Sequence, residues 1–190
     1  METDGALVEW SMHGRPDAFV EVVQRHEVAV HGFLARRARP DLADDLLGEV
    51  WLRAFAARSG YDPAHADALP WLYGIARNVL REYWRAGLHE AKAPAPDVVD
   101  PWDEVNARLD SAAWARSLAA AVRALPASER EVLLLVAWEQ LTPAEAANVL
   151  GIPQGTARSR LHRARTALRL ALREEATCPP HTHNLSTRTR

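Results

Sequence analysis

The fold is decided by residues 141–165, which read LTPAEAANVLGIPQGTARSRLHRAR. A short apolar segment is followed by a turn and then by a segment rich in arginine. Thr142 and Glu145 have the spacing of a capping box, in which each side chain bonds the other residue's backbone amide at the start of a helix. Gly151 supplies the permissive backbone that ends a helix, and Pro153 restarts the chain in a new direction. The stretch therefore predicts a helix-turn-helix, whose second helix commonly enters the major groove of duplex DNA.

The second helix of this motif has an apolar side and a basic side. Four apolar residues recur at steps of four, three and four and share one face that packs inward: Ala157, Leu161, Ala164 and Leu168. From Gln154 to Arg173 the chain has six arginines and no acidic residue. Side chains at the centre of the outward face can reach base edges, and flanking arginines can hold phosphates. The predicted contacts to duplex DNA are Thr156, Arg158, Ser159, Arg160, His162, Arg163 and Arg165.

Charge is segregated along the chain. The formal net charge is −2, but residues 88–112 sum to −4 and residues 113–173 sum to +5. A run of like charge usually marks only a solvated helix, yet here the helix cap, the turn and the apolar stripe all agree with DNA binding. The segregation of sign predicts one basic, DNA-facing surface and one acidic linker.

The sequence predicts an all-α protein with two small helical domains joined by a flexible linker. No stretch alternates with period two, and the turn pairs typical of β-hairpins are missing. The composition breaks near residue 88, and residues 89–110 contain three prolines and several acids. We therefore expect a first domain over 1–88, an acidic linker over 89–110, a helix-turn-helix domain over 111–173 and a disordered tail over 174–190.

Apolar spacing places further helices within each domain. In the first domain it predicts one or two helices between residues 19 and 34, another opening at Pro40, and another starting at Pro70. In the second domain, Ser128 and Glu131 have the spacing of a second capping box, which would begin the helix before the helix-turn-helix.

Several classes of protein are not favoured by the sequence. The chain has no apolar run of about 18 residues and no signal peptide, so a cytoplasmic protein without membrane insertion is expected. Cys178, His181 and His183 lie within six residues, but a structural metal site needs about four ligands held in place. We expect neither a metal nor a cofactor. Because no phosphate-binding glycine loop or nucleophile motif appears, an enzyme is not expected.

Three segments resemble the extracytoplasmic-function (ECF) sigma factors of the sigma-70 family. Residues 43–54, ADDLLGEVWLRA, are similar to the family's helix that binds core RNA polymerase. Residues 71–79, WLYGIARNV, are similar to its helix that meets the promoter −10 element. Residues 125–165, beginning LPASEREVLLL, resemble its −35-reading domain, and the likeness extends over residues 6–173. Leu47 and Gly48 depart from the pattern, which commonly has polar residues there.

The resemblance implies a bacterial transcription initiation factor that directs core RNA polymerase to specific promoters. It implies docking on the clamp helices and the flap of the polymerase, and restraint by an anti-sigma protein. The implied polymerase contacts lie on the exposed side of one helix: Asp44, Asp45, Glu49 and Arg53.

Capture of a melted −10 strand needs aromatic faces for an unstacked base and cations along the backbone. The helix that starts at Pro70, with the loop before it, has both residue types. Asn78 carries an amide donor and acceptor, so it can read a base edge, whereas Tyr73 fits either the core or this surface. The predicted −10 contacts are Tyr61, Arg77, Asn78, Arg81, Trp84 and Arg85.

Two other interpretations use some of the same features. A self-contained DNA-binding regulator would dock through the same arginine-rich helix, and an inactive helical adaptor would keep only the polymerase contact. A regulator of this kind usually needs dimer symmetry, and no dimerisation helix is obvious. In such a regulator two helices would have no role, namely the acidic helix over 44–53 and the aromatic and arginine-rich helix over 71–85. The initiation factor is therefore favoured.

Overall fold

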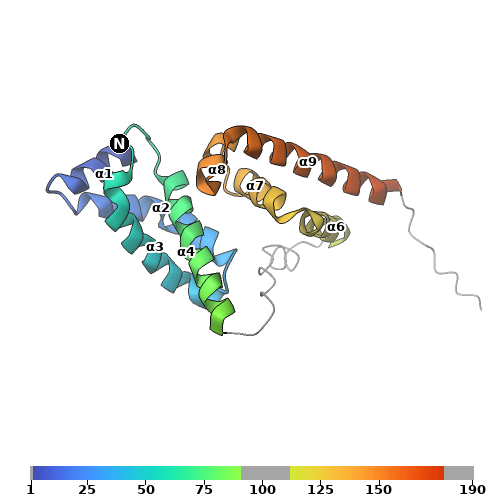
Figure 1. Ribbon diagram of the computed structural model, residues 1–190, viewed down its shortest axis with the longest axis horizontal. Helices are drawn as coiled ribbons and strands as arrows, with labels where there is room; N and C mark the ends of the chain where they lie inside the picture. The colour runs from blue at the N-terminus through green and yellow to red at the C-terminus, as the bar shows by residue number, and fades with distance from the viewer. Residues whose placement is uncertain (1, 91–111, 178–190) are drawn as a thin grey trace, which may run out of the picture.

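The computed structural model describes residues 2–90 and 112–177, which form two helical bundles without a strand (Figure 1). The first bundle contains α1 (Asp4–Met12), α2 (Ala18–Ala35), α3 (Ala43–Ala57) and α4 (Leu69–Glu90), with short 3-10 turns η1 (Pro40–Leu42) and η2 (Arg58–Gly60). The second contains α6 (Ala112–Ala124), α7 (Ala127–Ala137), α8 (Pro143–Leu150) and α9 (Gln154–Thr177). The predicted all-α fold is confirmed. No helix in the described ranges is both long and apolar enough to span a bilayer.

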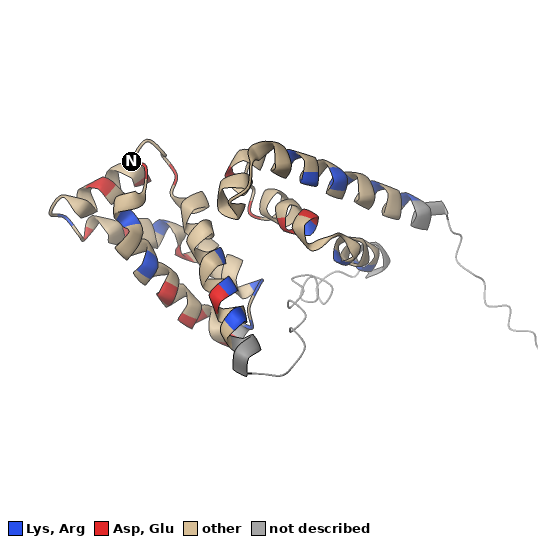
Figure 2. Cartoon of the chain, in the orientation of Figure 1, with Lys and Arg blue, Asp and Glu red and all other residues tan. Residues whose placement is uncertain are grey.

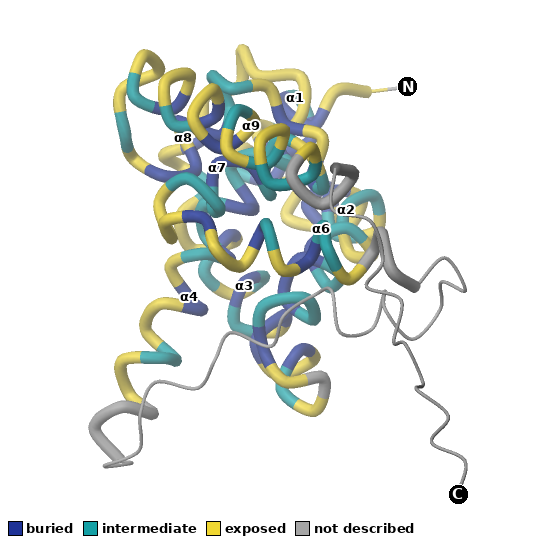
Figure 3. Tube along the Cα trace, turned by 90° about the vertical axis from the view of Figure 1, so that its right-hand side faces the viewer, coloured by how far each residue is buried: buried dark blue, intermediate teal, exposed yellow. Residues whose placement is uncertain are grey.

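In the first bundle α2, α3 and α4 pack against one another, and each carries buried positions (Figure 3). Val22, Val50 and Leu72 are fully buried. Phe33 of α2 stacks on Tyr73 of α4 with ring centroids 4.8 Å apart. Tyr73, for which the sequence left two positions open, is therefore a core residue. The apolar segment that predicted one or two helices forms the single helix α2.

Helix α1 was not predicted. Thr3 caps it by accepting a hydrogen bond from the Ala6 amide at 3.2 Å, and Leu7 and Val8 are buried in the core. A helix of 9 residues has too few turns for its apolar period to stand out, and it is stable only because it packs against the bundle.

The helix-turn-helix is confirmed in detail as α8 and α9. The Thr142 hydroxyl accepts from the Glu145 amide at 3.2 Å, and the Glu145 carboxylate accepts from the Thr142 amide at 2.7 Å. Gly151 ends α8 with φ of 65°, a left-handed conformation that favours glycine. On α9 the stripe that was expected to face inward is buried at Ala157, Leu161 and Ala164.

The second capping box, at Ser128 and Glu131, is absent. Helix α7 begins directly after Pro126, and its start has no side-chain hydrogen bond. The Pro126 carbonyl accepts instead from the amides of Glu129 and Arg130, at 2.9 and 3.0 Å. The Glu131 carboxylate instead accepts from the Arg77 guanidinium of α4 at 2.7 Å.

Two helices run past the expected domain boundaries. Helix α4 reaches Glu90, so the first two residues assigned to the linker are helical. Helix α9 reaches Thr177, so residues 174–177 do not belong to a disordered tail. Extending an existing helix is far easier than starting one, and glutamate and alanine favour this extension. The remaining linker residues and the tail with Cys178, His181 and His183 lie outside the described residues.

Candidate nucleic-acid and polymerase interfaces

The predicted duplex contacts lie along α9, where arginines recur along the length of the helix (Figure 2). Arg158, Ser159, His162 and Arg165 are exposed, whereas Thr156 and Arg160 are half-buried. The Ser159 hydroxyl donates to the Thr156 carbonyl at 2.9 Å, which leaves its lone pairs as acceptors. Because the buried stripe packs against α7 and α8, the basic side of the helix faces outward.

Arg163 is held by a neighbour that the sequence did not reveal. Its Nε donates to the Glu129 carboxylate at 2.6 Å, and the Glu129 side chain is only 13% exposed whereas that of Arg163 is 57% exposed. Glu129 lies in the first turn of α7. The carboxylate thus anchors one edge of the guanidinium within the domain and orients a side chain predicted to reach DNA.

The predicted −10 residues lie on α4 in two different environments. Asn78, Arg81 and Arg85 are exposed, whereas Trp84 is half-buried and meets the Tyr83 ring edge-on at 5.2 Å. The Arg77 side chain is 19% exposed because its guanidinium makes two contacts with Glu131 of α7, at 2.7 and 3.4 Å. One predicted DNA-binding cation is therefore already paired with a carboxylate.

Tyr61 supports the loop before α4 from the inside. It is 6% exposed, its hydroxyl donates to the His65 carbonyl at 2.8 Å, and its ring lies 5.1 Å from that of Trp71. Burial, and then the carboxylates of the surrounding aspartates, raise the pKa of Tyr61 to about 12. The side chain stays neutral at physiological pH and lines the back of a cleft.

This cleft lies between α4 and α8 and has a volume of about 1170 Å³. Asn78 and Arg81 line it from α4, and Glu145 and Asn148 line it from α8. The predicted −10 surface thus faces the helix-turn-helix of the same chain.

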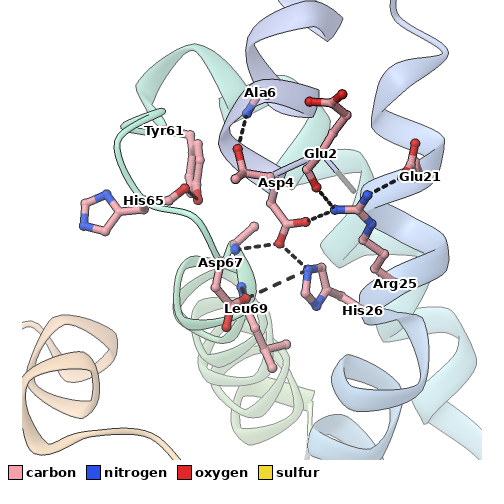
Figure 4. A network of polar contacts seen from close by, with 12 residues as sticks. Glu2, Asp4, Ala6, Glu21, Arg25, His26, Tyr61, His65, Asp67 and Leu69 are labelled. Atoms are coloured by element: carbon pink, nitrogen blue, oxygen red, sulfur yellow. Dashed lines mark hydrogen bonds and ion pairs between the residues drawn. The ribbon is translucent and has the colours of Figure 1, made fainter.

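A buried carboxylate positions the loop that leads into α4 (Figure 4). The Asp4 side chain accepts from the Ala68 amide at 2.9 Å and from Arg25 at 2.9 Å, and it contacts His26 Nε2 at 2.6 Å. Burial alone would raise the pKa of Asp4, but the Ala68 amide, His26 and Arg25 together lower it below its usual value. The network ties α1 and α2 to the start of α4, and sequence reasoning missed it.

This network also contains the candidate metal ligands of the described residues. Asp4, His26 and Asp67 bring possible ligand atoms within 4.8 Å of one another. The Arg25 guanidinium already balances the charge of the Asp4 carboxylate. The three side chains are therefore explained as part of an ion-pair network, without a metal ion.

The predicted polymerase contacts lie on α3. Asp44 and Asp45 are exposed, and Asp44 has His31 as a neighbour at 3.2 Å. Glu49 and Arg53 pair with each other at 2.6 Å, and Arg53 also reaches Glu82 of α4 at 2.6 Å. The two aspartates are therefore exposed acids at the start of α3, with Asp44 beside His31, whereas Glu49 and Arg53 also brace the bundle.

The two residues that depart from the family pattern have different surroundings. Leu47 is buried in the core, with 9% exposure. Gly48 is exposed, and a β-carbon built on it would meet no atom within 4 Å. Neither residue offers the polymerase a polar side chain.

Comparison with known proteins matches both bundles to one family. The model of Sigma-70 region 2 matches residues 22–87, and that of Sigma-70, region 4 matches residues 115–168. The RNA polymerase sigma factor CarQ of Myxococcus xanthus is 35% identical over 163 residues, which cover 85% of this chain and 92% of CarQ. The chain belongs to the ECF sigma factors of the sigma-70 family.

Further relatives agree with this assignment. The ECF sigma factor SigL of Mycobacterium tuberculosis is 32% identical over 164 residues, covering 83% of this sigma factor and 86% of SigL. The structure of CnrH, in complex with the cytosolic domain of CnrY, matches with a TM-score of 0.62 and 27% identity over 90% of this chain and 98% of CnrH. The sigma factor RpoE from Bartonella quintana has the same fold, with a TM-score of 0.57 and 23% identity over 82% and 96% of the two chains.

The family assignment predicted from the three sequence segments is therefore confirmed. As an ECF sigma factor, the chain is a transcription initiation factor that directs RNA polymerase to promoters. Region 2 covers most of α2, all of α3 and most of α4, and region 4 covers most of α6, all of α7 and α8, and most of α9.

Proposed function

We propose that this sigma factor divides promoter recognition between its two bundles. Helix α9 reads the −35 element as duplex DNA, α4 captures the melted −10 strand, and α3 docks on the clamp helices of core polymerase. The domain limits that we propose follow the described helices, with the first domain ending near Glu90 and the second beginning near Ala112. The protein supplies binding and strand capture, while the polymerase supplies the chemistry.

The observation that carries the −35 assignment is the separation of the two faces of α9. Ala157, Leu161 and Ala164 are buried on one side, which fixes the helix on α7 and α8. Arg158 and Arg165 are exposed on the other side and can hold phosphates on the groove walls. His162, which is also exposed, lies where a side chain can reach base edges.

The −10 assignment is supported by an amide and arginines on the exposed side of α4. Asn78 can pair with the edge of an unstacked base, and Arg81 and Arg85 can follow the backbone of a single strand. The half-buried ring of Trp84 offers an aromatic face beside them.

We further propose that a protein partner restrains the factor by covering surfaces that core polymerase needs. CnrH, the structural relative described above, was solved in complex with the cytosolic domain of CnrY. The corresponding partner here would be an anti-sigma protein. A factor that binds promoter DNA and polymerase would act in the cytoplasm.

The test is transcription from a promoter library by purified bacterial core polymerase, with and without this chain. DNA that carries randomised −35 and −10 segments is transcribed, and the templates that yield transcripts are sequenced. We expect initiation only when the chain is present, with one preferred sequence in each segment.

Two variants test which helix reads which promoter segment, α9 the −35 segment and α4 the −10 segment. His162→Ala should change the preferred sequence only in the −35 segment, and Asn78→Ala only in the −10 segment. The Arg15→Ala variant is the control, since Arg15 lies in neither interface. The assignment is wrong if His162→Ala changes the preferred −10 sequence or Asn78→Ala changes the preferred −35 sequence. It is also wrong if neither variant changes any preference.

A further inference from the structure

The guanidinium of Arg163 is held by the protein on one edge and open to a ligand on the other. Its Nε donates to the Glu129 carboxylate at 2.6 Å. The terminal nitrogens Nη1 and Nη2 also carry N–H donors, and they donate to no other residue in the described parts of the chain. Because the Arg163 side chain is 57% exposed, these terminal nitrogens can reach a ligand outside the bundle.

Glu129 is fixed in position relative to α9. It lies in the first turn of α7, where its amide donates to the Pro126 carbonyl at 2.9 Å. Helix α7 is held by the buried side chains of Val132 and Leu133 and packs directly against α9. The Glu129 side chain is only 13% exposed. The carboxylate is therefore a preorganised acceptor rather than a mobile surface acid.

The other arginines predicted to contact duplex DNA have no such partner. Arg158, Arg160 and Arg165 form no ion pair with any residue that the structure describes. They keep their full charge, which suits contacts to phosphates. The charge of Arg163 is balanced by Glu129, and this carboxylate also repels a phosphate that approaches from the same side. Arg163 is therefore poorly suited to a phosphate contact.

The position of Arg163 suits a base contact instead. It lies about one helical turn beyond Ser159, on the side of α9 that faces away from the buried Ala157 and Leu161. An arginine reads a base edge with two N–H groups held in a fixed direction. Because Glu129 already restricts the side chain, less conformational freedom is lost when these groups meet DNA.

We propose that Glu129 is a specificity-determining residue that acts through Arg163. It positions the terminal nitrogens of Arg163 toward base edges and keeps this arginine away from the phosphates. Glu129 thereby raises the preference of the protein for its own −35 sequence and lowers its affinity for other duplexes. This inference rests on the proposed reading of the −35 element by α9.

The test compares two duplexes that bind the full-length chain. One carries the −35 sequence selected from the promoter library described above, and the other is a random duplex of the same length. Glu129→Leu removes both the acceptor and the charge while keeping a side chain of similar size. The control is Glu27→Leu, the same substitution at an exposed acid of α2. Circular dichroism checks that both variants keep their helices.

We expect Glu129→Leu to lower the preference for the selected duplex by about two- to tenfold, because Arg163 must then be ordered at the moment of binding. Its affinity for the random duplex should rise, with a slope of log K against log salt that is steeper by about 0.9, since Arg163 becomes free to pair with a phosphate. The control should keep the wild-type preference and slope.

A second pair of proteins tests whether Glu129 acts through Arg163. Glu129→Leu is introduced into an Arg163→Ala background, and the preference for the selected duplex is measured with and without it. We expect no further loss of preference in this background, because the side chain that Glu129 positions is gone. A loss that is equal with and without Arg163 would show that Glu129 acts in another way and would overturn the inference.

The outcomes separate this inference from the proposed function. A wild type without any preference between the duplexes would overturn the −35 role of α9 and the inference together. A wild-type preference that Glu129→Leu leaves unchanged would overturn the inference alone. Equal weakening of both duplexes by Glu129→Leu would also overturn it, because that result indicates a loss of structure rather than of specificity. An unchanged salt slope would overturn the claim that Glu129 keeps Arg163 away from phosphates.

Discussion

The carboxylate of Asp4 accepts a hydrogen bond of 2.9 Å from the amide of Ala68, 64 residues further along the chain. The amide of Asp4 in turn donates to the Ala66 carbonyl at 3.2 Å. Through these contacts α1 holds the end of the loop from which α4 begins. The position of the proposed −10 surface thus depends on a helix that carries none of the predicted DNA-binding residues.

Asp4→Asn should destabilise the first bundle. The amide cannot satisfy both Arg25 and His26 as the carboxylate does, and the loss of charged hydrogen bonds should lower the free energy of unfolding by about 2 kcal/mol at pH 7. Urea unfolding measures this value. Asp62→Asn is the control, since the Asp62 side chain is 63% exposed in the same loop. Equal stability of the two variants would contradict a structural role for the network.

The same residue predicts a pH dependence. The pKa of Asp4 is lowered in the folded state, so its contribution is fully present above the unfolded pKa, near 3.8, and is lost as the pH falls through the lower folded value. Wild-type stability should therefore drop more steeply below about pH 4 than that of Asp4→Asn. Parallel stability curves for the two proteins would exclude this titration.

Two glycines should respond to alanine in opposite ways. Gly48 lies inside α3 with open space around its α-carbon, so Gly48→Ala should stabilise the protein by about 1 kcal/mol through helix propensity. A β-carbon at Gly5 would lie 2.2 Å from the Pro63 carbonyl oxygen, so Gly5→Ala must push the loop away from α1. Thermal unfolding should give a higher midpoint for the first variant and a lower one for the second. The same sign for both would contradict the packing described for α1.

Local sequence signals predicted the second bundle better than the first. The capping box at Thr142, the turn at Gly151 and the stripe through Leu161 act over neighbouring residues, so their spacing alone specifies the geometry. Asp4 resembles any acid near a chain end, because its partners lie 21 to 64 residues away. No periodicity encodes a contact at that separation.

The candidate sites also contain features that local spacing predicts and features that it does not. The exposed side of α9 could be predicted from helical spacing, since it lies opposite the buried stripe. The pairing of Arg77 with Glu131, and of Arg163 with Glu129, could not, because it depends on how the second bundle lies against α4 and on how α7 packs on α9. Glu131 was interpreted as a helix cap because its local spacing fits one, and a tertiary ion pair replaced that role.

The arginines on the flanks of α9 should contribute to DNA affinity through phosphates. Arg158→Ala and Arg165→Ala should each weaken duplex binding and reduce the slope of log K against log salt by about 0.9, because each phosphate contact releases condensed counterions. Titrations of a random duplex at several salt concentrations measure the slope. Arg15→Ala, in the first bundle, should leave it unchanged. An unchanged slope for both α9 variants would remove them from the phosphate contacts.

The centre of the α9 face should instead determine sequence preference. Ser159→Ala or His162→Ala should reduce discrimination between a selected −35 duplex and a random duplex by about 1 to 3 kcal/mol for a good base contact. Competition between the two duplexes measures the difference. Equal loss of affinity for both would indicate a backbone contact and contradict direct readout.

The central claim is that the exposed aspartates of α3, Asp44 and Asp45, bind this sigma factor to core polymerase. Co-elution of the purified full-length chain with bacterial core RNA polymerase tests it most directly. The wild type is compared with an Asp44→Arg, Asp45→Arg variant and with a control in which the exposed Glu9 and Glu27 are both changed to arginine. We predict that the wild type and the control co-elute with the polymerase and that the α3 variant does not. Co-elution of a folded α3 variant at the wild-type level would contradict the claim.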